Sequence, residues 1–315
     1  MAETAGPVGI GLTGFASAAA VTEAAAPSPA EQESLEDIAR LLSGQKIAIL
    51  TGAGLSTDSG IPDYRGPDSL PRTPLTYQQF TGSDELRRRY WARNHLGWQH
   101  LRRADPNPGH AAVAAMERHG ITSGIITQNV DRLHEAAGAV DVVDLHGRFD
   151  QVICLHCHTQ FSRQHLAGIL EELNPGFVGL AEEAGGAAAA PDADAELDRT
   201  LVQRFVVAPC EVCGGMLKPD FVFFGESVPK DRVARSYAMV DAADALLVAG
   251  SSLTVMSGLR FPRHMAKRGK SVVIINRGTT RGDDTATIKL EAGVSESLSY
   301  LADALSDGAT LPVPG

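Results

Sequence analysis

Short apolar runs that alternate with helical stretches constrain the fold of this chain more than any other feature of its sequence. Each run is compact enough to be a buried β-strand, and the runs span residues 46–51, 124–127, 142–145, 245–249 and 271–275. Between several of them lie stretches with helical spacing, at residues 110–119, 130–137 and 233–243. This alternation predicts an α/β fold with a doubly wound, Rossmann-like parallel sheet. Ligands of such sheets bind beyond the carboxyl ends of the strands.

Residues 150–214 interrupt the alternation and contain all four cysteines of the chain. We therefore predict a small module inserted into a Rossmann-like domain, which is formed by residues 33–149 and 215–305. A low-complexity insert of Gly and Ala, residues 185–191, lies inside the module.

Both ends of the chain are predicted to be tails. Residues 1–32 are rich in Ala, Gly, Pro and Ser without a sustained hydrophobic period, which is typical of disorder. A helix is expected over residues 34–42, where apolar residues recur at helical spacing. Residues 306–315 form the second predicted tail.

The charge balance excludes several classes of function. The chain has 28 basic and 38 acidic residues and a net charge of −10, so a general nucleic-acid surface is not expected. No apolar run approaches the roughly 18 residues of a membrane span. The first 39 residues lack the Lys and Arg that secretory and mitochondrial leaders carry. We therefore expect a cytoplasmic protein that binds neither nucleic acid nor membrane.

The cysteines form two CxxC pairs, Cys154 with Cys157 and Cys210 with Cys213. Paired thiolates at this spacing are typical of a tetrahedral structural zinc site. A redox dithiol is the alternative, although one pair would suffice for it. If all four thiolates bind one Zn²⁺, no open position remains, so this metal would stabilise the module without taking part in catalysis.

A glycine-rich turn, Gly52-Ala53-Gly54, follows the first strand and lets backbone N–H groups approach a phosphate. Ser56 or Thr57 is expected to cap a following helix. The dinucleotide fingerprint G-x-G-x-x-G is incomplete, because Thr57 occupies the third glycine position. A plain strand-to-helix turn therefore remains the alternative.

Glycines and a proline break residues 58–66 into a long loop. The loop carries Asp63, Tyr64 and Arg65, a combination that could cover a ligand. A solvated surface loop is the alternative.

Polar side chains cluster where two other strands end. Gln128, Asn129 and Asp131 could bind ribose hydroxyls, an amide or an ordered water, although helix capping by Asn129 or Asp131 is a common alternative. His146 is a candidate general base, since an unperturbed pKa of about 6.5 suits proton transfer at neutral pH. A structural histidine bonded to backbone is its alternative.

Two further strand ends carry small polar residues that fit a ribose and an adenine edge. They are Gly250-Ser251-Ser252 and Asn276-Arg277-Gly278. Either could also be only a turn.

Considered together, these motifs resemble the sirtuins, a family of NAD-dependent protein deacylases. The segments that carry the resemblance are residues 52–65, 127–131, 145–147, the two CxxC pairs, residues 223–226, 250–252 and Asn276. They occur in the family's order and cover roughly residues 33–305.

The resemblance implies an NAD site, one structural Zn²⁺ and an acyl-lysine protein or peptide as substrate. The implied NAD contacts are Gly52, Ala53, Gly54, Ser56, Ile61, Asp63, Tyr64, Arg65, Gln128, Asn129, Asp131, Gly250, Ser251, Ser252, Asn276, Arg277, Gly278 and, through its backbone, Val294. His146 would act as general base on a ribose hydroxyl. The implied products are nicotinamide, free lysine and an acylated ADP-ribose.

The resemblance also assigns roles to neighbours of these residues. Asn129 and Gln128 would position ribose and water, and Asp131 with Ile61 would hold the departing carboxamide. The segment Phe223-Phe224-Gly225-Glu226 would pair with the substrate backbone by strand addition.

Residues 89–94, 97–98 and 106–108 resemble the class II branch of the family. Within them, Tyr90 and Arg93 are three residues apart and could face one way on a helix. Desuccinylase-type sirtuins hold an acidic acyl chain with a similarly spaced pair, and Arg suits a carboxylate because it can bond bidentately. A salt bridge on the helix surface is one interpretation of this pair, and the other is the hypothesis that the chain prefers carboxylated acyl groups such as succinyl or glutaryl.

Three other functions remain open. Protein mono-ADP-ribosylation uses the same cofactor. A module that senses NAD or ADP-ribose without turnover would need neither His146 nor Asn129. A hydride-transferring dehydrogenase is disfavoured by Thr57 and by the broken helix after it. The oligomeric state and the protein targets do not follow from the sequence.

Overall fold

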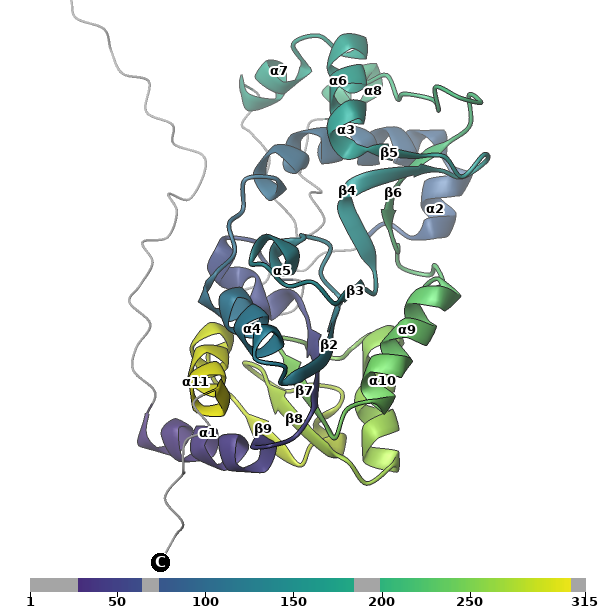
Figure 1. Ribbon diagram of the computed structural model, residues 1–315. Helices are drawn as coiled ribbons and strands as arrows, with labels where there is room; N and C mark the ends of the chain where they lie inside the picture. The colour runs from purple at the N-terminus through teal and green to yellow at the C-terminus, as the bar shows by residue number, and fades with distance from the viewer. Residues whose placement is uncertain (1–27, 64–73, 184–198, 307–315) are drawn as a thin grey trace, which may run out of the picture.

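The computed structural model describes residues 28–63, 74–183 and 199–306, which form a large parallel sheet and a smaller antiparallel one (Figure 1). The large sheet has the strand order β3-β2-β1-β7-β8-β9. Its strands are β1 (Ile47–Thr51), β2 (Thr122–Thr127), β3 (Val142–Asp144), β7 (Ala245–Ala249), β8 (Ser271–Ile275) and β9 (Ile288–Leu290). All neighbouring pairs are parallel, which confirms the predicted α/β fold.

Alternate residues of each central strand enter two separate cores. Ile47 and Ile49 of β1 pack into one core, and Ala48 and Leu50 pack into the other. Burial on both faces explains why the strands are continuous apolar runs. Each fully buried Ile or Leu contributes roughly 1.5–3 kcal/mol to the free energy of folding.

Helices cover both faces of this sheet (Figure 1). The first core is closed by α1 (Pro29–Leu42), α4 (Pro108–Arg118) and α11 (Val294–Ser306). The second is closed by α9 (Lys230–Asp241) and α10 (Met256–Lys267). The short helix α5 (Leu133–Ala136) and the 3₁₀ turn η3 (Asp283–Thr285) complete the connections.

Helix α1 begins five residues earlier than predicted. The Ser28 hydroxyl accepts from the Glu31 N–H at 3.3 Å, while the Glu31 carboxylate accepts from the Ser28 N–H at 2.7 Å. This reciprocal capping box, with Pro29 at the first helical position, fixes the start of the helix. The last residues of the predicted N-terminal tail are therefore helical. Residues 1–27 and 307–315 lie outside the described residues.

The smaller sheet has the strand order β5-β4-β6. It consists of β4 (Gly147–Cys154), β5 (Gln160–Ser162) and β6 (Leu217–Phe221), and is accompanied by α6 (Arg163–Leu173), α7 (Phe177–Glu183) and α8 (Arg199–Arg204). The low-complexity insert at residues 185–191 lies outside the described residues.

Two helices that precede the cysteines share the core of this smaller module. Phe80 of α2 (Tyr77–Gly82) and Trp91 of α3 (Asp84–Leu101) pack in one cluster with Val152, Leu166 and Phe205. The sequence division placed α2, α3 and β6 in the Rossmann-like domain. The structure instead groups all three with the cysteine-bearing module, because α2 and α3 face it and β6 pairs with β4.

Among the described helices, none combines the length and the apolar composition needed to cross a bilayer.

Candidate functional site

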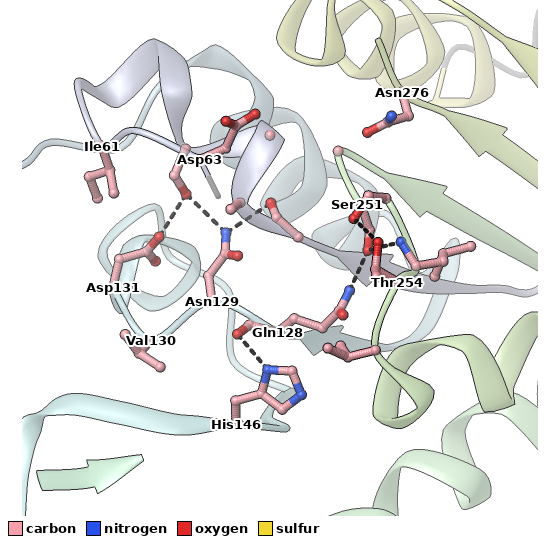
Figure 2. Close-up of a pocket in the computed structure, with 18 of the residues that line it drawn as sticks. Ile61, Asp63, Gln128, Asn129, Val130, Asp131, His146, Ser251, Thr254 and Asn276 are labelled. Atoms are coloured by element: carbon pink, nitrogen blue, oxygen red, sulfur yellow. Dashed lines mark hydrogen bonds between the residues drawn. The ribbon is translucent and has the colours of Figure 1, made fainter. Parts of the chain in front are cut away.

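One cavity of about 420 Å³ lies where β1, β2, β7 and β8 end (Figure 2). We call it the strand-end cavity. Its walls come mainly from the segments that follow these strands, residues 52–56, 128–131, 250–255 and 276–279. This volume is typical of small-molecule sites. Parallel strands deliver their carboxyl ends to one edge of the sheet, which is why motifs far apart in the sequence meet here.

Glycines allow two of these segments to touch. Gly54 N–H donates to the carbonyl of Gly250 at 2.9 Å. A Cβ at residue 52 would lie 2.7 Å from that oxygen, and a Cβ at Gly250 would lie 2.4 Å from the backbone nitrogen of Leu55. Gly250 also has a φ of +66°, which favours glycine. The close approach of the two backbones therefore depends on both glycines.

Backbone donors face the space between these segments. Gly52, Gly54, Leu55 and Ser56 use their N–H groups within the protein. The N–H groups of Ala53, Ser251 and Ser252, all in residues that line the cavity, have no acceptor among the residues that the structure describes. Backbone N–H groups next to glycines suit an anionic phosphate. This side of the cavity thus fits the pyrophosphate of NAD.

The helix expected after the glycine turn is absent. The chain instead makes two short 3₁₀ turns, η1 (Ala53–Leu55) and η2 (Thr57–Ser59), and no side chain caps either of them. Ser56 turns inward, where its hydroxyl donates to Asp131 Oδ2 at 2.6 Å and accepts from Asn129 Nδ2 at 3.0 Å. The prediction that Ser56 or Thr57 caps a helix is therefore wrong. A longer helix cannot form, because Gly60 adopts a left-handed conformation and Pro62 follows.

Asp131 and Asn129 form a buried polar pair around Ser56 (Figure 2). Burial raises the pKa of the Asp131 carboxyl, whereas hydrogen bonds from Ser56 and from the Leu133 N–H lower it. Asn129 also donates to the carbonyl of Gly52 at 3.0 Å. Asp131 accepts from Leu133 N–H at 3.0 Å, but the N-cap residue of α5 is Arg132, and Asp131 also lines the cavity.

Gln128 and His146 form a second group (Figure 2). Gln128 Nε2 donates to Ser251 Oγ at 2.7 Å and to the carbonyl of Thr51 at 3.2 Å. The backbone carbonyl of Gln128 lies 3.1 Å from Nδ1 of His146. A carbonyl oxygen can only accept, so Nδ1 carries the proton, and the lone pair of the neutral ring is on Nε2.

The environment of His146 keeps its ring neutral. Burial, together with the charges of Arg232 and Arg260, lowers the pKa of His146 to about 4, against the opposing effect of the hydrogen bond to Gln128. The Ser257 hydroxyl lies 2.7 Å from Nε2 and donates to it. His146 is therefore a neutral base at pH 7 with a defined tautomer, and its basic nitrogen Nε2 accepts a hydrogen bond from the Ser257 hydroxyl.

A second cavity, of about 640 Å³, begins on the other side of His146. It shares His146, Val222, Phe223, Phe224 and Val255 with the strand-end cavity. The remaining walls come from residues 225–234 and 256–260. Two spaces that could hold two reactants therefore meet at one basic side chain.

The segment 223–226 is held firmly at this junction. Glu226 accepts from the Phe223 N–H at 2.8 Å and pairs with the buried Lys218 at 3.1 Å. The Phe224 carbonyl accepts from Tyr77 N–H at 2.9 Å. All four residues of this segment line the second cavity.

The other predicted NAD contacts divide into three groups. Ile61, Asp63, Asn276, Arg277 and Gly278 line the strand-end cavity. Tyr64 and Arg65 lie outside the described residues. Val294 is the buried first residue of α11 and is not among the described residues that line the cavity.

Tyr90 and Arg93 are not among the described lining residues of either cavity. The Tyr90 ring is buried and lies edge-to-face with Phe223, 5.3 Å between centroids. Tyr90 thus lies directly behind a residue that both cavities share.

The four cysteine sulfurs lie within 4.8 Å of one another. Cys154 Sγ is 3.5 Å from Cys213 Sγ, and Cys157 Sγ is 3.7 Å from Cys210 Sγ. Four thiolates at the corners of a tetrahedron around Zn²⁺ lie about 3.8 Å apart when each Zn–S bond is about 2.3 Å. The geometry therefore fits one structural zinc, as predicted.

Several lining residues escaped the sequence analysis. In the strand-end cavity they are Leu75, Val130, Phe221, Val222, Leu253, Thr254, Val255 and Thr279. Most directly adjoin a predicted motif, so adjacency was the available signal. Ser257 had no such signal, since its contact with His146 depends on the placement of α10.

Comparison with known proteins agrees with this geometry. Residues 52–257 match the model of the Sir2 family. An NAD-dependent protein deacetylase 1 of Mycobacterium avium (strain 104) is 57% identical over 270 residues, which are 86% of this chain and 95% of that protein. An NAD-dependent protein deacetylase 1 of Streptomyces coelicolor is 53% identical over 273 residues, which are 86% of this chain and 90% of that protein.

Solved structures give the same result. A Sir2–p53 peptide–NAD⁺ complex superimposes with a TM-score of 0.69 at 28% identity. The match includes 85% of this chain and 97% of the chain in that structure. Sir2Tm bound to a propionylated peptide has a TM-score of 0.67 at 28% identity with the same coverage. The family match spans well over half of the chain, and both relatives far exceed 30% identity. With two cavities that meet at a neutral histidine, and with a four-cysteine cluster in its smaller module, this chain belongs to the Sir2 family, the sirtuins.

Proposed function

We propose that this chain is an NAD-dependent protein-lysine deacylase, which transfers the acyl group to ADP-ribose and releases nicotinamide. The observation that carries this proposal is His146, a neutral base that two cavities share. The family and the names of the relatives support deacylation and not the mono-ADP-ribosyltransferase alternative.

The strand-end cavity is the proposed NAD site. Bound NAD supplies an electrophilic ribose carbon that accepts the acyl oxygen as nicotinamide leaves. The N–H groups of Ala53, Ser251 and Ser252 bind the pyrophosphate, and Asn276 lies on the adenosine side. Asp131 and Ile61 hold the carboxamide of nicotinamide, while Asn129 positions the ribose.

His146 is the proposed general base. Its Nε2 would accept the proton of a ribose hydroxyl, and the oxygen that loses this proton would attack the acyl carbon. The bond from that carbon to the lysine nitrogen would then break with a proton passing to the amine, and one water would be consumed as the acylated ADP-ribose forms. The bond from Nδ1–H to the Gln128 carbonyl strengthens when the ring becomes positive, so it stabilises the imidazolium that forms. Ser257 must release Nε2 before the ribose hydroxyl can donate to it.

The second cavity is the proposed acyl-lysine site. Residues 223–226 and 255–257 both line it, and an extended peptide would pair with these backbone segments by strand addition. The preference for carboxylated acyl groups through Tyr90 and Arg93 stays a proposal. Its support is the contact between Tyr90 and Phe223.

Zinc has a structural role in this proposal. All four thiolates are used as ligands, so Zn²⁺ holds the end of β4 against the loop of Cys210 and Cys213. Cysteines that stay reduced and bind a metal are typical of a reducing compartment, which supports the cytoplasm as the site of action.

The test is a mass-spectrometric assay of the purified chain with NAD. The substrates are one peptide sequence with acetyl-, succinyl-, glutaryl- or lipoyl-lysine. His146→Ala is run beside it, and the exposed His119→Ala serves as the matched control. We expect NAD-dependent loss of one acyl group, retained in His119→Ala and reduced at least about 100-fold in His146→Ala.

Three results would contradict parts of this proposal. NAD cleavage with ADP-ribose left on protein would favour the transferase alternative. Equal activity of His146→Ala and wild type would exclude His146 as the base. An unchanged succinyl-to-acetyl rate ratio in Arg93→Ala would exclude the acyl role of Arg93.

A further inference from the structure

The second cavity has a basic character that the deacylation chemistry does not require. Lys230, the first residue of α9, and Arg260 of α10 both line it. The sole carboxylate among its described lining residues is Glu226. That carboxylate is already bound by Lys218 and by the Phe223 N–H. The cavity therefore presents positive charge that is not balanced within it.

Two neighbouring cations on α9 do have acidic partners. Arg232 pairs with Asp220, and Arg235 pairs with Asp141. Among the residues that the structure describes, neither Lys230 nor Arg260 makes an ion pair. The chain as a whole carries a net charge of −10. The positive charge of these two cations at the cavity is therefore opposite in sign to the net charge of the molecule.

Arg260 also lies close to the reaction centre. It follows Ser257 by one helical turn on α10, and Ser257 touches His146. The charge of Arg260 is near enough to lower the pKa of His146. A substrate carboxylate that binds Arg260 would therefore sit near the acyl-lysine.

We propose that Lys230 and Arg260 select protein substrates with Asp or Glu beside the acyl-lysine. The inference rests on the proposed deacylase function and adds a substrate class to it. The apolar lining residues Val233 and Met256 bind the peptide regardless of charge. The two cations then distinguish acidic from basic flanks, because an opposite charge gains attraction and a like charge is repelled.

The experiment compares three acetyl-lysine peptides that differ only in their flanking residues, which are glutamate, glutamine or lysine. Each partly exposed ion pair is worth roughly a two- to fivefold change. We expect kcat/KM for the glutamate peptide to exceed that for the lysine peptide by about tenfold. The preference should shrink as NaCl rises from about 0.05 to 0.5 M, because salt screens exposed charges.

The variant Lys230→Glu/Arg260→Glu should reverse the order of the peptides. Arg263→Glu/Lys267→Glu is the matched control, since it changes the same charges at exposed positions of α10 that do not line the cavity. The control should keep the wild-type order and activity. The glutamine peptide reports catalysis without flanking charge, so within each protein the glutamate and lysine rates are divided by its rate, which removes any effect of the variant on the basal reaction.

The outcomes distinguish a failure of the proposed deacylase function from a failure of the inference about flanking residues. If no peptide is deacylated, the proposed function fails. If all peptides are deacylated at equal rates, or the order survives in the double variant, the flank inference is overturned and the function stands. If the double variant alters only a succinyl-to-acetyl ratio on the glutamine peptide, the cations bind the acyl chain and the flank inference is likewise overturned.

Discussion

At the scale of single residues, the chemistry depends on which nitrogen of His146 is basic. The Gln128 carbonyl fixes the proton on Nδ1, and the ring stays neutral because burial penalises its charge. The Ser257 hydroxyl on Nε2 stabilises the same neutral form, since it can donate only to an unprotonated nitrogen. Activity should therefore be lost as the pH falls through the pKa of His146.

Replacing Ser257 with alanine should move that loss to higher pH. Without the donated hydrogen bond, the neutral ring loses up to roughly 1.5 kcal/mol, which corresponds to a rise of up to about one unit in the pKa of His146. The measurement is the acidic limb of kcat/KM between about pH 3.5 and 8, which includes the pKa of His146 near 4, with circular dichroism to confirm folding at each pH. Arg232 and Arg260 remain in place, so their effect on the ring is constant.

Ser257→Thr retains the hydroxyl and should keep the wild-type limb. If the limb of Ser257→Ala stays where it is, or moves to lower pH, Ser257 does not act on Nε2. A fall in kcat alone, at an unchanged limb, would indicate a structural role.

The residue scale also shows where sequence reasoning succeeds. Gly52 and Gly54 were predicted to leave room for a phosphate at the backbone, and a Cβ at either of them would lie 3.0 Å or less from a backbone atom. Ser56 was predicted as a cap and instead bridges Asn129 and Asp131. A hydroxyl serves either purpose, and only the fold decides which partner is near.

At the scale of elements, the junction between His146 and β4 is the tightest point described. Gly147 begins β4 with a φ of +85°, and a Cβ there would lie 2.0 Å from the carbonyl oxygen of Asp220 in β6. The antiparallel pairing of β4 with β6 therefore depends on glycine at this position. The same pairing holds the residue that precedes it, His146.

Gly147→Ala should lower the free energy of unfolding by about 3 kcal/mol. A left-handed φ and a backbone clash each cost roughly 1–3 kcal/mol. Gly138→Ala is the matched control, because its φ is +94° but nothing lies within 4 Å of the added atom. It should lose only about 1 kcal/mol. Urea unfolding measures both, and equal losses would contradict the clash.

The elements differ in how well the sequence predicts them. Strand β7 has the predicted bounds, Ala245–Ala249, because a fully apolar run between polar residues has one interpretation. Helix α3 packs in the cysteine-bearing module through Trp91. The apolar residues of a helix show that it is buried, but they do not show which part of the protein it packs against. The start of α1 could have been found, because Ser28-Pro29-Ala30-Glu31 is a capping-box sequence.

At the scale of the whole molecule, stability should fall in mild acid. Burial lowers the pKa of His110 to about 4 and of His134 to about 3, compared with about 6.5 in an unfolded chain. Below pH 6.5 the unfolded chain binds protons that the folded chain excludes, so the free energy of unfolding decreases as the pH falls towards these values. Each histidine contributes up to about 1.4 kcal/mol per pH unit.

His110→Gln should make that decline shallower by up to about 1.4 kcal/mol per pH unit. Glutamine retains the capping box with Asn107, in which His110 Nδ1 accepts from the Asn107 N–H at 3.3 Å. Urea unfolding at pH 4.5 to 7.5 measures the slope. The exposed His119→Gln should not change it. Equal slopes in wild type and His110→Gln would mean that His110 is protonated in the folded chain.

The order of strands in the large sheet has a consequence for synthesis. Central strand β1 pairs with β7, and Lys46 bonds Asp244, 198 residues later in the chain. At about 5–20 residues per second, a ribosome needs roughly 10–40 s to deliver that partner. Throughout this interval the nascent chain presents one edge of β1, an apolar strand that is ready to pair. The interval between translation of β1 and of β7 is therefore when this protein depends most on chaperones to escape aggregation.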